Sequence, residues 1–427
     1  MKTKLGNKFW FALTLFSFIG QVAWIVENMY FNVFIYKMFN ASVSDISLMV
    51  SASAVAATLT TIFIGTLSDK IGKRKLFMCL GYILWGISII SFVFVRKDII
   101  SSIFGATVNS AAVGVSIVII LDCVMTFFGS SANDAAFNAW LTDSTDSTNR
   151  GSAEGVNSMM PLVAILAVFG GFMAFDLEKS ESWSYIFLII GAVVLIVGVI
   201  GFFIIEDKYQ KVSDDGYFKS ILYGFNPSTI ASNKTFYLTL LCFTVFNISI
   251  QVFIPYLILY YEESLGMADY GLIMAPAIIL ASAFTFVWGR IYDKKGFYFS
   301  VAVSCILLFA GYVLLYLFKQ TTLVFAGSLF MMCGYLSGAG VFGAKVRDLT
   351  PRNKAGMLQG VRIVSQVLIP GIIGPFISKC VLSGAELVYN NDGTTSFIPN
   401  SNIFIAALGV ALICVLIICA IKKKEAK

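Results

Sequence analysis

Charged breaks divide the chain into long apolar runs, and each run is long enough for one helix to cross a bilayer. Such a helix needs about 20 apolar residues. Only 13% of the residues are charged, against about 25% in a soluble domain. The runs also lack the period-two alternation of an outer-membrane barrel. The sequence therefore predicts an all-α membrane protein with twelve transmembrane helices. Their expected bounds are 9–36, 46–67, 76–95, 116–141, 156–175, 183–204, 236–261, 268–288, 299–318, 321–345, 357–379 and 402–421.

The basic residues indicate which side of the membrane each loop faces. Twelve spans place both termini on one side, which we expect to be the cytoplasm. Of the 30 Lys and Arg residues, Arg362 then lies within a span and 23 lie in cytoplasmic segments, as the positive-inside rule requires. The outer loops hold Lys37, Arg96, Lys97, Lys179, Lys319 and Lys379. We expect a multi-pass protein of the plasma or bacterial inner membrane.

The chain consists of two halves that resemble each other. Residues 44–72 align with 268–296 at an offset of 224. This offset pairs Asp45, Gly65, Asp69 and Gly72 with Asp269, Gly289, Asp293 and Gly296. A second alignment, at an offset of 205, pairs Asp143, Gly151 and Gly155 with Asp348, Gly356 and Gly360. We predict a six-helix bundle over 1–204, a cytoplasmic linker over 205–235 and a second six-helix bundle over 236–427. Parallel repeats of this kind are typical of alternating-access transporters.

The difference between the two offsets indicates an insertion in the first half. It falls near residues 97–115, which are weakly apolar. We predict a helix or lid there, on the outer surface and against the fourth span.

Two motifs carry a resemblance to known families. The run GTLSDKIGKRK at 65–75 resembles the loop signature of the major facilitator superfamily, and its pattern G-x-x-x-D-K-x-G recurs at 289–296. The run NDAAFNAWLTDSTDSTNRG at 133–151 resembles the glycoside–pentoside–hexuronide:cation symporters and their sucrose-transporter relatives. This resemblance matches Asp134 to an acid of the fourth helix. It matches Ala139, Asp143, Thr145, Asp146 and Arg150 to a run at the inner end of that helix.

The same resemblance leaves the coupling ion open. The sodium-coupled members carry further acids in the second helix, and here none lies between Asp45 and Asp69. Protons, sodium ions or no coupling ion remain alternatives. The chain contains no histidine, so any proton chemistry must use carboxylates.

The acids well inside the spans are candidates for cation or proton coupling: Asp134, Glu27 and Asp122. Their counterparts in the second half are Ala339, Gln251 and Gly327. The coupling site is therefore expected in the first half. The alternative for Glu27 is a structural pair or a permanently protonated donor. For Asp122 it is a residue of the outer vestibule or a helix-packing group.

Polar side chains follow one stripe of the first helix and one of the seventh, at helical spacing. In this superfamily these helices line the central cavity, so we expect the stripes to contact a neutral polyol. The candidate solute-binding residues are Gln21, Trp24, Asn28, Asn32, Asn247 and Gln251. Amides in membrane bundles also form hydrogen bonds between helices, which is the alternative here. We expect Trp85, Trp183, Trp288 and the many Phe residues to face lipid or to belong to the aromatic belts at the membrane surfaces.

A third group is predicted to form an inner gate that opens and closes during transport. Its members are Gly65, Asp69, Gly72, Arg74, Asp143, Arg150, Asp293, Asp348 and Arg362. The glycines would permit close helix approach, and the aspartates would pair with basic residues and helix ends. Arg362 could instead extend to the membrane surface, or receive an anionic substrate.

These patterns predict a secondary transporter that moves a glycoside or oligosaccharide with a proton or another cation. The alternatives are an exporter of amphipathic drugs or lipids and a solute sensor that does not transport. We expect no enzyme activity, cofactor, metal or nucleic-acid partner, and a protein that works as a monomer in the bilayer. No G-x-x-x-x-G-K-[ST] motif occurs, so no ATP hydrolysis is expected.

Overall fold

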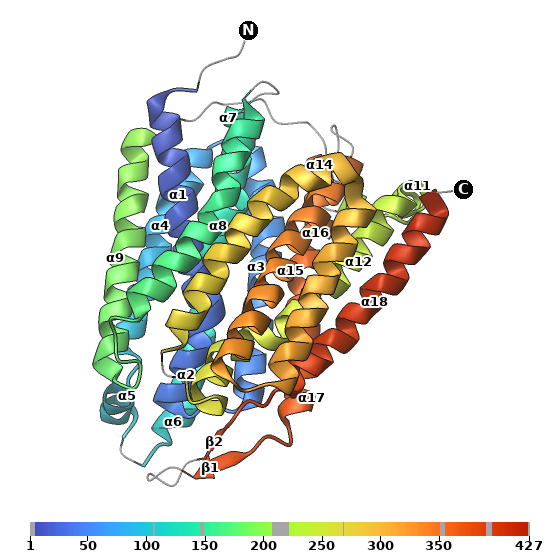
Figure 1. Ribbon diagram of the computed structural model, residues 1–427. Helices are drawn as coiled ribbons and strands as arrows, with labels where there is room; N and C mark the ends of the chain where they lie inside the picture. Colours follow the sequence, from blue (N-terminus) through green and yellow to red (C-terminus); the bar gives the residue numbers. More distant parts are fainter. Residues whose placement is uncertain are drawn as a thin grey trace. The chain divides into compact units, whose positions relative to one another are not determined.

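The computed structural model describes residues 5–105, 107–145, 149–206, 222–267, 269–350, 355–389 and 395–425. This part of the chain is almost entirely helical (Figure 1). The elements up to residue 206 are α1 (Asn7–Ile25), η1 (Val26–Tyr30), α2 (Phe31–Phe39), α3 (Val43–Ile71), α4 (Arg74–Ser91), η2 (Phe92–Phe94), α5 (Lys97–Phe104), α6 (Ser110–Gly129), η3 (Ser130–Phe137), α7 (Asn138–Ser144), α8 (Arg150–Phe172) and α9 (Ser180–Ile204). Those from residue 222 onward are η4 (Tyr223–Phe225), α11 (Pro227–Ser232), α12 (Lys234–Phe253), η5 (Ile254–Tyr256), α13 (Leu257–Leu259), η6 (Tyr260–Ser264), α14 (Tyr270–Leu317), α15 (Thr321–Leu349), α16 (Ala355–Ile363), η8 (Val364–Leu368), α17 (Ile369–Leu382), β1 (Leu387–Tyr389), β2 (Thr395–Phe397) and α18 (Asn402–Glu425).

The helices confirm the predicted spans. Within the described residues, 11 continuous helical segments are long and apolar enough to cross a membrane. One of them, α14, has 48 residues, which corresponds to about 72 Å at 1.5 Å per residue, more than twice the hydrocarbon thickness. Its backbone leaves the helical conformation at Gly296. Counting α14 as two spans gives the twelve transmembrane helices that the sequence predicts.

The repeat is visible in the backbone at two equivalent glycines. Gly72 and Gly296 have φ angles of 70° and 77°, a conformation that is costly for residues with a Cβ atom. Each glycine ends one span and starts the next. The predicted close helix approach at Gly65 and Gly289 is not seen within the described residues. A Cβ atom on Gly65 would lie 3.7 Å from Ala135, an ordinary contact, and one on Gly289 would meet nothing within 4 Å.

The chain divides into two compact units. The first contains Met1–Ala41 and Ala52–Lys219, and the second contains Ser42–Ser51 and Ser220–Lys427. Residues 207–221 of the predicted linker lie outside the described residues, and its later part contains η4 and α11. The predicted domain boundaries at 204 and 236 stay predictions.

The first unit packs through small residues. Helix α4 runs along α9, and α1 packs against α8 and α9 (Figure 1). A Cβ atom on Gly86 of α4 would lie 2.5 Å from the carbonyl oxygen of Gly191, and one on Gly191 would lie 2.6 Å from a side-chain carbon of Ile90. The two backbones therefore approach each other because both positions lack a side chain, which is the usual way that membrane helices gain packing contact.

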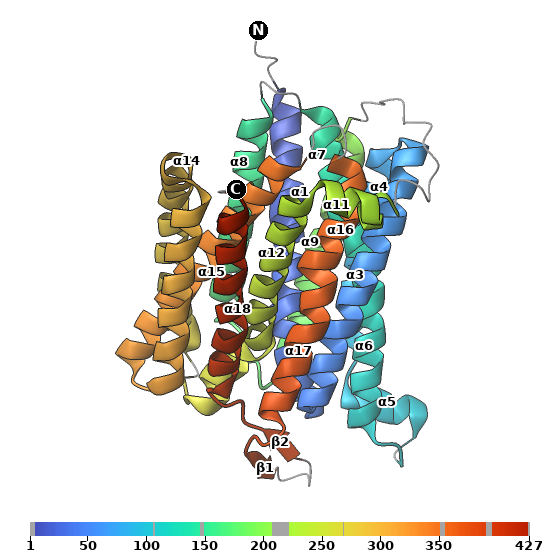
Figure 2. The same ribbon diagram turned by 90° about the vertical axis from the view of Figure 1, so that its right-hand side faces the viewer.

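The second unit is held by helix packing and buried hydroxyl pairs. Helix α12 packs against α17 and α18, and Figure 2 shows these three helices running alongside one another. Ser249 of α12 lies 2.8 Å from the hydroxyl of Tyr312 in α14. Ser304 of α14 lies 2.7 Å from Ser337 of α15. These pairs satisfy polar groups where lipid and packed side chains offer no water.

Two short elements lie outside the spans. Helix α5 confirms the predicted helix near 97–115, and it packs against α6, the beginning of the fourth span. Its Ile100 is buried while Ile103 is 70% exposed. The strands β1 and β2 form an antiparallel pair with Leu387 opposite Phe397. The sequence did not predict this pair, because three-residue strands are too short to show an alternating pattern.

The expectation that three tryptophans face lipid is wrong. Trp85, Trp183 and Trp288 are 0%, 1% and 7% exposed. The indole N–H of Trp183 donates a hydrogen bond to the Leu177 carbonyl at 2.9 Å, and its ring packs near Phe187. Large aromatic side chains gain more contact in the bundle interior than in lipid, and sequence position alone does not distinguish the two.

Candidate functional site

A π-helical segment in the first span carries Glu27. This segment, η1, interrupts the α-helix between α1 and α2. A π-turn inserts one extra residue and changes the direction of the side chains that follow, and such turns occur frequently at functional sites. Glu27 is only 7% exposed. Its carboxyl group therefore lies inside the first unit, away from both water and lipid.

Two hydroxyl groups from other spans converge on this carboxyl group. The hydroxyls of Ser53 in α3 and Thr126 in α6 lie 2.7 and 2.8 Å from Oε1 of Glu27. The two hydroxyl oxygens are themselves 2.8 Å apart. Asp122, one helical turn before Thr126, is 2% exposed and interacts electrostatically with Glu27 and Ser53. We refer to Glu27, Ser53, Asp122 and Thr126 as the acid–hydroxyl cluster.

The acid–hydroxyl cluster contains no basic side chain. Within the described residues, Glu27 interacts with the other three members and with Asp134, and none of these is lysine or arginine. Oε2 of Glu27 and Oδ1 of Asp122 are buried and accept no hydrogen bond. Two neighbouring buried carboxylates without a counter-charge are strongly unfavourable. The cluster must therefore hold at least one proton or another cation.

Asp134 lies close to this cluster on a second π-helical segment. It belongs to η3, is half-buried, and accepts a hydrogen bond from Ser130 at 2.9 Å. The neighbouring Asn133 donates to the hydroxyl of Tyr82 at 2.7 Å, and Tyr82 donates to the Phe16 carbonyl at 2.7 Å. This buried chain of hydrogen bonds ties η3 to α4 and α1, and so fixes the segment that carries Asp134.

The predicted solute-binding side chains of the first span divide into two kinds. The amides of Asn28 and Asn32 donate to carbonyl groups one turn earlier on their own helix, at 2.7 and 2.9 Å. These amide N–H groups therefore donate to backbone carbonyls in and beside η1. Gln21 is half-buried, and its amide makes no hydrogen bond to the described residues. Trp24 packs against Trp85 with 5.0 Å between ring centroids.

In the second unit, the predicted amides remain available. Asn247 and Gln251 on α12 are half-buried, and neither amide makes a hydrogen bond within the described part of the chain. The Cβ atom of Gln251 lies against Gly374 of α17, where an added side chain would collide with it. Gln21, Asn247 and Gln251 therefore keep donors and acceptors that no described residue occupies, as solute-binding amides require.

The structure brings together two of the predicted inner-gate residues. Arg74, at the start of α4, donates through Nε to Asp143 in α7 at 3.1 Å and through Nη1 to Ser68 in α3 at 2.7 Å. Three spans of the first unit are joined there. In the second unit, Asp348, the counterpart of Asp143, accepts a hydrogen bond from the hydroxyl of Tyr292 at 3.0 Å.

Two further charged residues of the predicted inner gate lie in the described part of the chain. Asp293 is exposed, and Arg362 is half-buried in α16 just before η8. The side chains of Asp69 and Arg150 lie outside the described part of the structure, as does Asp146. The role of these residues in a gate stays a prediction.

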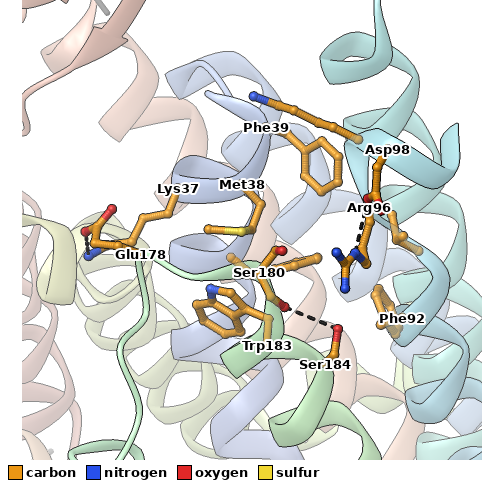
Figure 3. A pocket seen from close by; sticks show the side chains of 13 residues that line it. Lys37, Met38, Phe39, Phe92, Arg96, Asp98, Glu178, Ser180, Trp183 and Ser184 are labelled. Carbon is orange, nitrogen blue, oxygen red and sulfur yellow. Dashed lines mark hydrogen bonds and ion pairs between the residues drawn. The ribbon is translucent and has the colours of Figure 1, made fainter. Parts of the chain in front are cut away.

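A separate cavity of about 460 Å³ lies between α2, α5 and the start of α9 (Figure 3). None of the predicted site residues lines it. Two ion pairs lie in its lining, Lys37 with Glu178 at 2.6 Å and Arg96 with Asp98 at 3.1 Å, and Lys97 is a further charged lining residue. The hydrogen bond from Arg96 holds the pKa of Asp98 below its ordinary value.

Comparison with protein families gives a direct assignment. The sequence matches the model of the Major Facilitator Superfamily over residues 10–375. The chain belongs to the major facilitator superfamily. Members of this superfamily are membrane transporters, so the protein is a multi-pass transporter. No curated protein matches the sequence.

Solved structures of transporters in this superfamily share the fold. One is a bacterial homologue of the human lysosomal transporter Spinster, in an inward-facing and unoccupied conformation. It is 14% identical, with a TM-score of 0.72 and 98% of each chain covered. Another is the nucleoside transporter NupG, which is 13% identical, with a TM-score of 0.67, 98% of this chain covered and 99% of that chain. At such low identity the likeness shows the fold alone.

Sequence reasoning missed the two hydroxyl members of the acid–hydroxyl cluster. Ser53 was one of several hydroxyl residues in the second span, and nothing marked it out. A sequence pattern did point to Thr126, because polar residues recur every four positions along the fourth span. They are Asp122, Thr126, Ser130 and Asp134. Residues four apart lie on one helix face, so this row could have identified Thr126.

Proposed function

We propose that the protein is a secondary transporter that carries a glycoside or oligosaccharide together with a proton, by alternating access. The observation that carries the proposal is the acid–hydroxyl cluster, because an intramembrane acid without a basic partner is usually functional. The chain has no histidine and no nucleotide-binding loop. A carboxyl group that gains and loses a proton is then the simplest means of coupling. Another small cation in place of the proton remains the alternative.

The free amides support a neutral, hydroxyl-rich solute. Gln21, Asn247 and Gln251 can each donate and accept hydrogen bonds, and the ring of Trp24 offers an apolar face of the kind that sugars stack on. A nucleoside also carries a sugar, and one structural neighbour is a nucleoside transporter. Nucleosides are therefore the second solute class to test. We assign the protein to the glycoside–pentoside–hexuronide branch on the match around Asp134.

The location follows from the charge distribution. The excess of Lys and Arg in the segments that contain the termini and the 205–235 linker favours cytoplasmic termini. We place the protein in the plasma or bacterial inner membrane, acting as a monomer. In this orientation the Arg74–Asp143 ion pair belongs to the cytoplasmic gate.

Two other functions make different predictions. Export of amphipathic molecules requires a binding surface dominated by Phe and Met, and the free amides oppose it. A sensor that does not transport has little use for ion pairs at an inner gate, and the Arg74–Asp143 pair opposes it.

The test is the external pH of a lightly buffered, de-energised cell suspension after pulses of single sugars, glycosides and nucleosides. We expect alkalinisation with one solute class, and its loss in Glu27→Gln and Asp134→Asn. Glu181→Gln is the matched control, because Glu181 lies in the first turn of α9 and its side chain is 64% exposed. Uptake of labelled solute without alkalinisation would reject proton symport. No uptake of any member of the panel would reject the solute assignment.

A further inference from the structure

The acid–hydroxyl cluster contains more close oxygen contacts than its hydroxyl protons can satisfy. Oε1 of Glu27, Oγ of Ser53 and Oγ1 of Thr126 form a triangle with sides of 2.7, 2.8 and 2.8 Å. Each side has the length of a hydrogen bond, and each hydrogen bond needs one proton. A serine and a threonine hydroxyl supply one proton each. Two protons serve three contacts, so the triangle lacks one proton unless Glu27 is protonated.

Asp122 adds a second buried acid beside the triangle. It lies one helical turn before Thr126 on α6 and interacts electrostatically with Glu27. Oε2 of Glu27 and Oδ1 of Asp122 are buried and accept no hydrogen bond from the described residues. The two acids are 7% and 2% exposed, so bulk solvent hardly reaches them. A carboxyl group in the neutral form costs far less in such surroundings than an unpaired carboxylate.

The distances favour a proton over a metal ion. An ion the size of Ca²⁺ keeps each oxygen ligand about 2.3–2.6 Å from itself, which places neighbouring ligands more than about 3 Å apart. The three oxygens of the triangle are closer together than that. The described residues also contain no group of three or more His, Cys, Asp or Glu side chains that could hold a metal ion.

We propose that Glu27 and Asp122 share one exchangeable proton, which the hydroxyls of Ser53 and Thr126 hold between the two carboxyl groups. Asp134 titrates as a separate group. The other titratable side chains that face the cluster within the described residues are Asp134 and the half-buried Cys123. Neither supplies a positive charge. The inference rests on the proposed function only in identifying the shared proton as the one that accompanies the solute.

The sharing of the proton has a direct consequence. Two carboxyl groups that interact strongly do not titrate independently, and each pH midpoint belongs to the pair. Removal of either acid must therefore change the titration of the other. Acids that act independently would titrate in the single variants as they do in the native protein.

The experiment is infrared titration of the purified protein without any solute, following the carbonyl stretch of protonated carboxylic acids. We expect a band from the cluster that Glu27→Gln and Asp122→Asn together abolish. In each single variant, the midpoint of the remaining band should move by about one pH unit or more. Asp134→Asn should move it by less. Unmoved midpoints in both single variants would overturn the proposal. A band that survives in the double variant and is not removed by adding Asp134→Asn would also overturn it.

The hydroxyl groups provide a second test if an acid variant does not fold. Ser53→Ala and Thr126→Val keep both acids and should each move the midpoint. Thr58→Val is the matched control, since the Thr58 hydroxyl is buried without a hydrogen bond and lies on the same helix as Ser53. If Thr58→Val moves the midpoint as far as Ser53→Ala and Thr126→Val do, the shifts reflect only the loss of a polar group. That result would reject the role of the Ser53 and Thr126 hydroxyls in holding the shared proton.

Sodium chloride and choline chloride separate the proton from a metal ion. A midpoint that is the same in both salts supports a site for protons, and one that moves only with sodium overturns it. Because no solute is present, the titration does not depend on transport. A shared titration in a protein that moves no solute would reject the proposed function and leave the shared proton standing.

Discussion

Substitution of Gly86 by alanine should destabilise the first unit. The added Cβ atom would lie 2.5 Å from the carbonyl oxygen of Gly191 and 2.6 Å from the backbone nitrogen of Leu195. Ordinary contact begins near 3.4 Å. Both obstacles are backbone atoms, so α9 would have to move away from α4 by about 0.9 Å. Overpacking of this kind typically costs about 1–3 kcal/mol.

The control separates the collision from the change in helix propensity. Gly170 of α8 is exposed, and a Cβ atom there would meet nothing within 4 Å. Alanine at either position gains up to about 1 kcal/mol of helix propensity. This gain is common to Gly86→Ala and Gly170→Ala, so the difference between the two variants measures the collision alone.

Thermal unfolding in detergent, followed by tryptophan fluorescence, measures that difference. About 1 kcal/mol corresponds to about 2–4 °C for a unit of roughly this size. We therefore expect Gly86→Ala to melt several degrees below Gly170→Ala at the same heating rate. If Gly86→Ala melts at or above the control, the close approach of α4 and α9 does not limit stability and the reasoning fails.

Three further predictions concern other parts of the chain. Gly296→Ala should lower the melting temperature by a few degrees relative to Gly289→Ala, because only Gly296 has a positive φ angle, which costs an alanine about 1 kcal/mol or more; equal melting would count against this. Arg74→Gln removes the ion pair to α7 and should destabilise by about 1 kcal/mol, whereas Arg74→Lys should recover part of the loss in the same assay. The pKa of Asp98 lies below its ordinary value because of the hydrogen bond from Arg96. Its stabilising effect is therefore complete above the ordinary aspartate range and is lost as the pH falls through the lowered pKa. Hydrogen exchange of α5 at neutral and acidic pH should show this as lower protection factors in acid, after correction for the slower intrinsic exchange of amides there.

Much of the fold follows from the sequence because the bilayer imposes a simple requirement. Each crossing needs a long apolar helix, so the twelve spans can be read from the apolar runs. The repeat could also be recognised from the sequence. Only glycine adopts the positive φ angles of positions 72 and 296 without strain, so both halves carry a glycine there. The buried acids were also visible, since a charged residue in an apolar run has few structural explanations.

Only the tertiary structure decided which side chains meet. Ser53 and Thr126 are 26 and 99 positions from Glu27 along the chain, and no local pattern pairs them. The π-helical segments η1 and η3 shift the side chains after them away from the regular helical period, so the sequence did not show that Asp122 and Asp134 both interact with Glu27. Local sequence determines that a helix forms and how apolar it is. The direction of each side chain depends on π-turns and neighbouring helices, which only packing in three dimensions specifies.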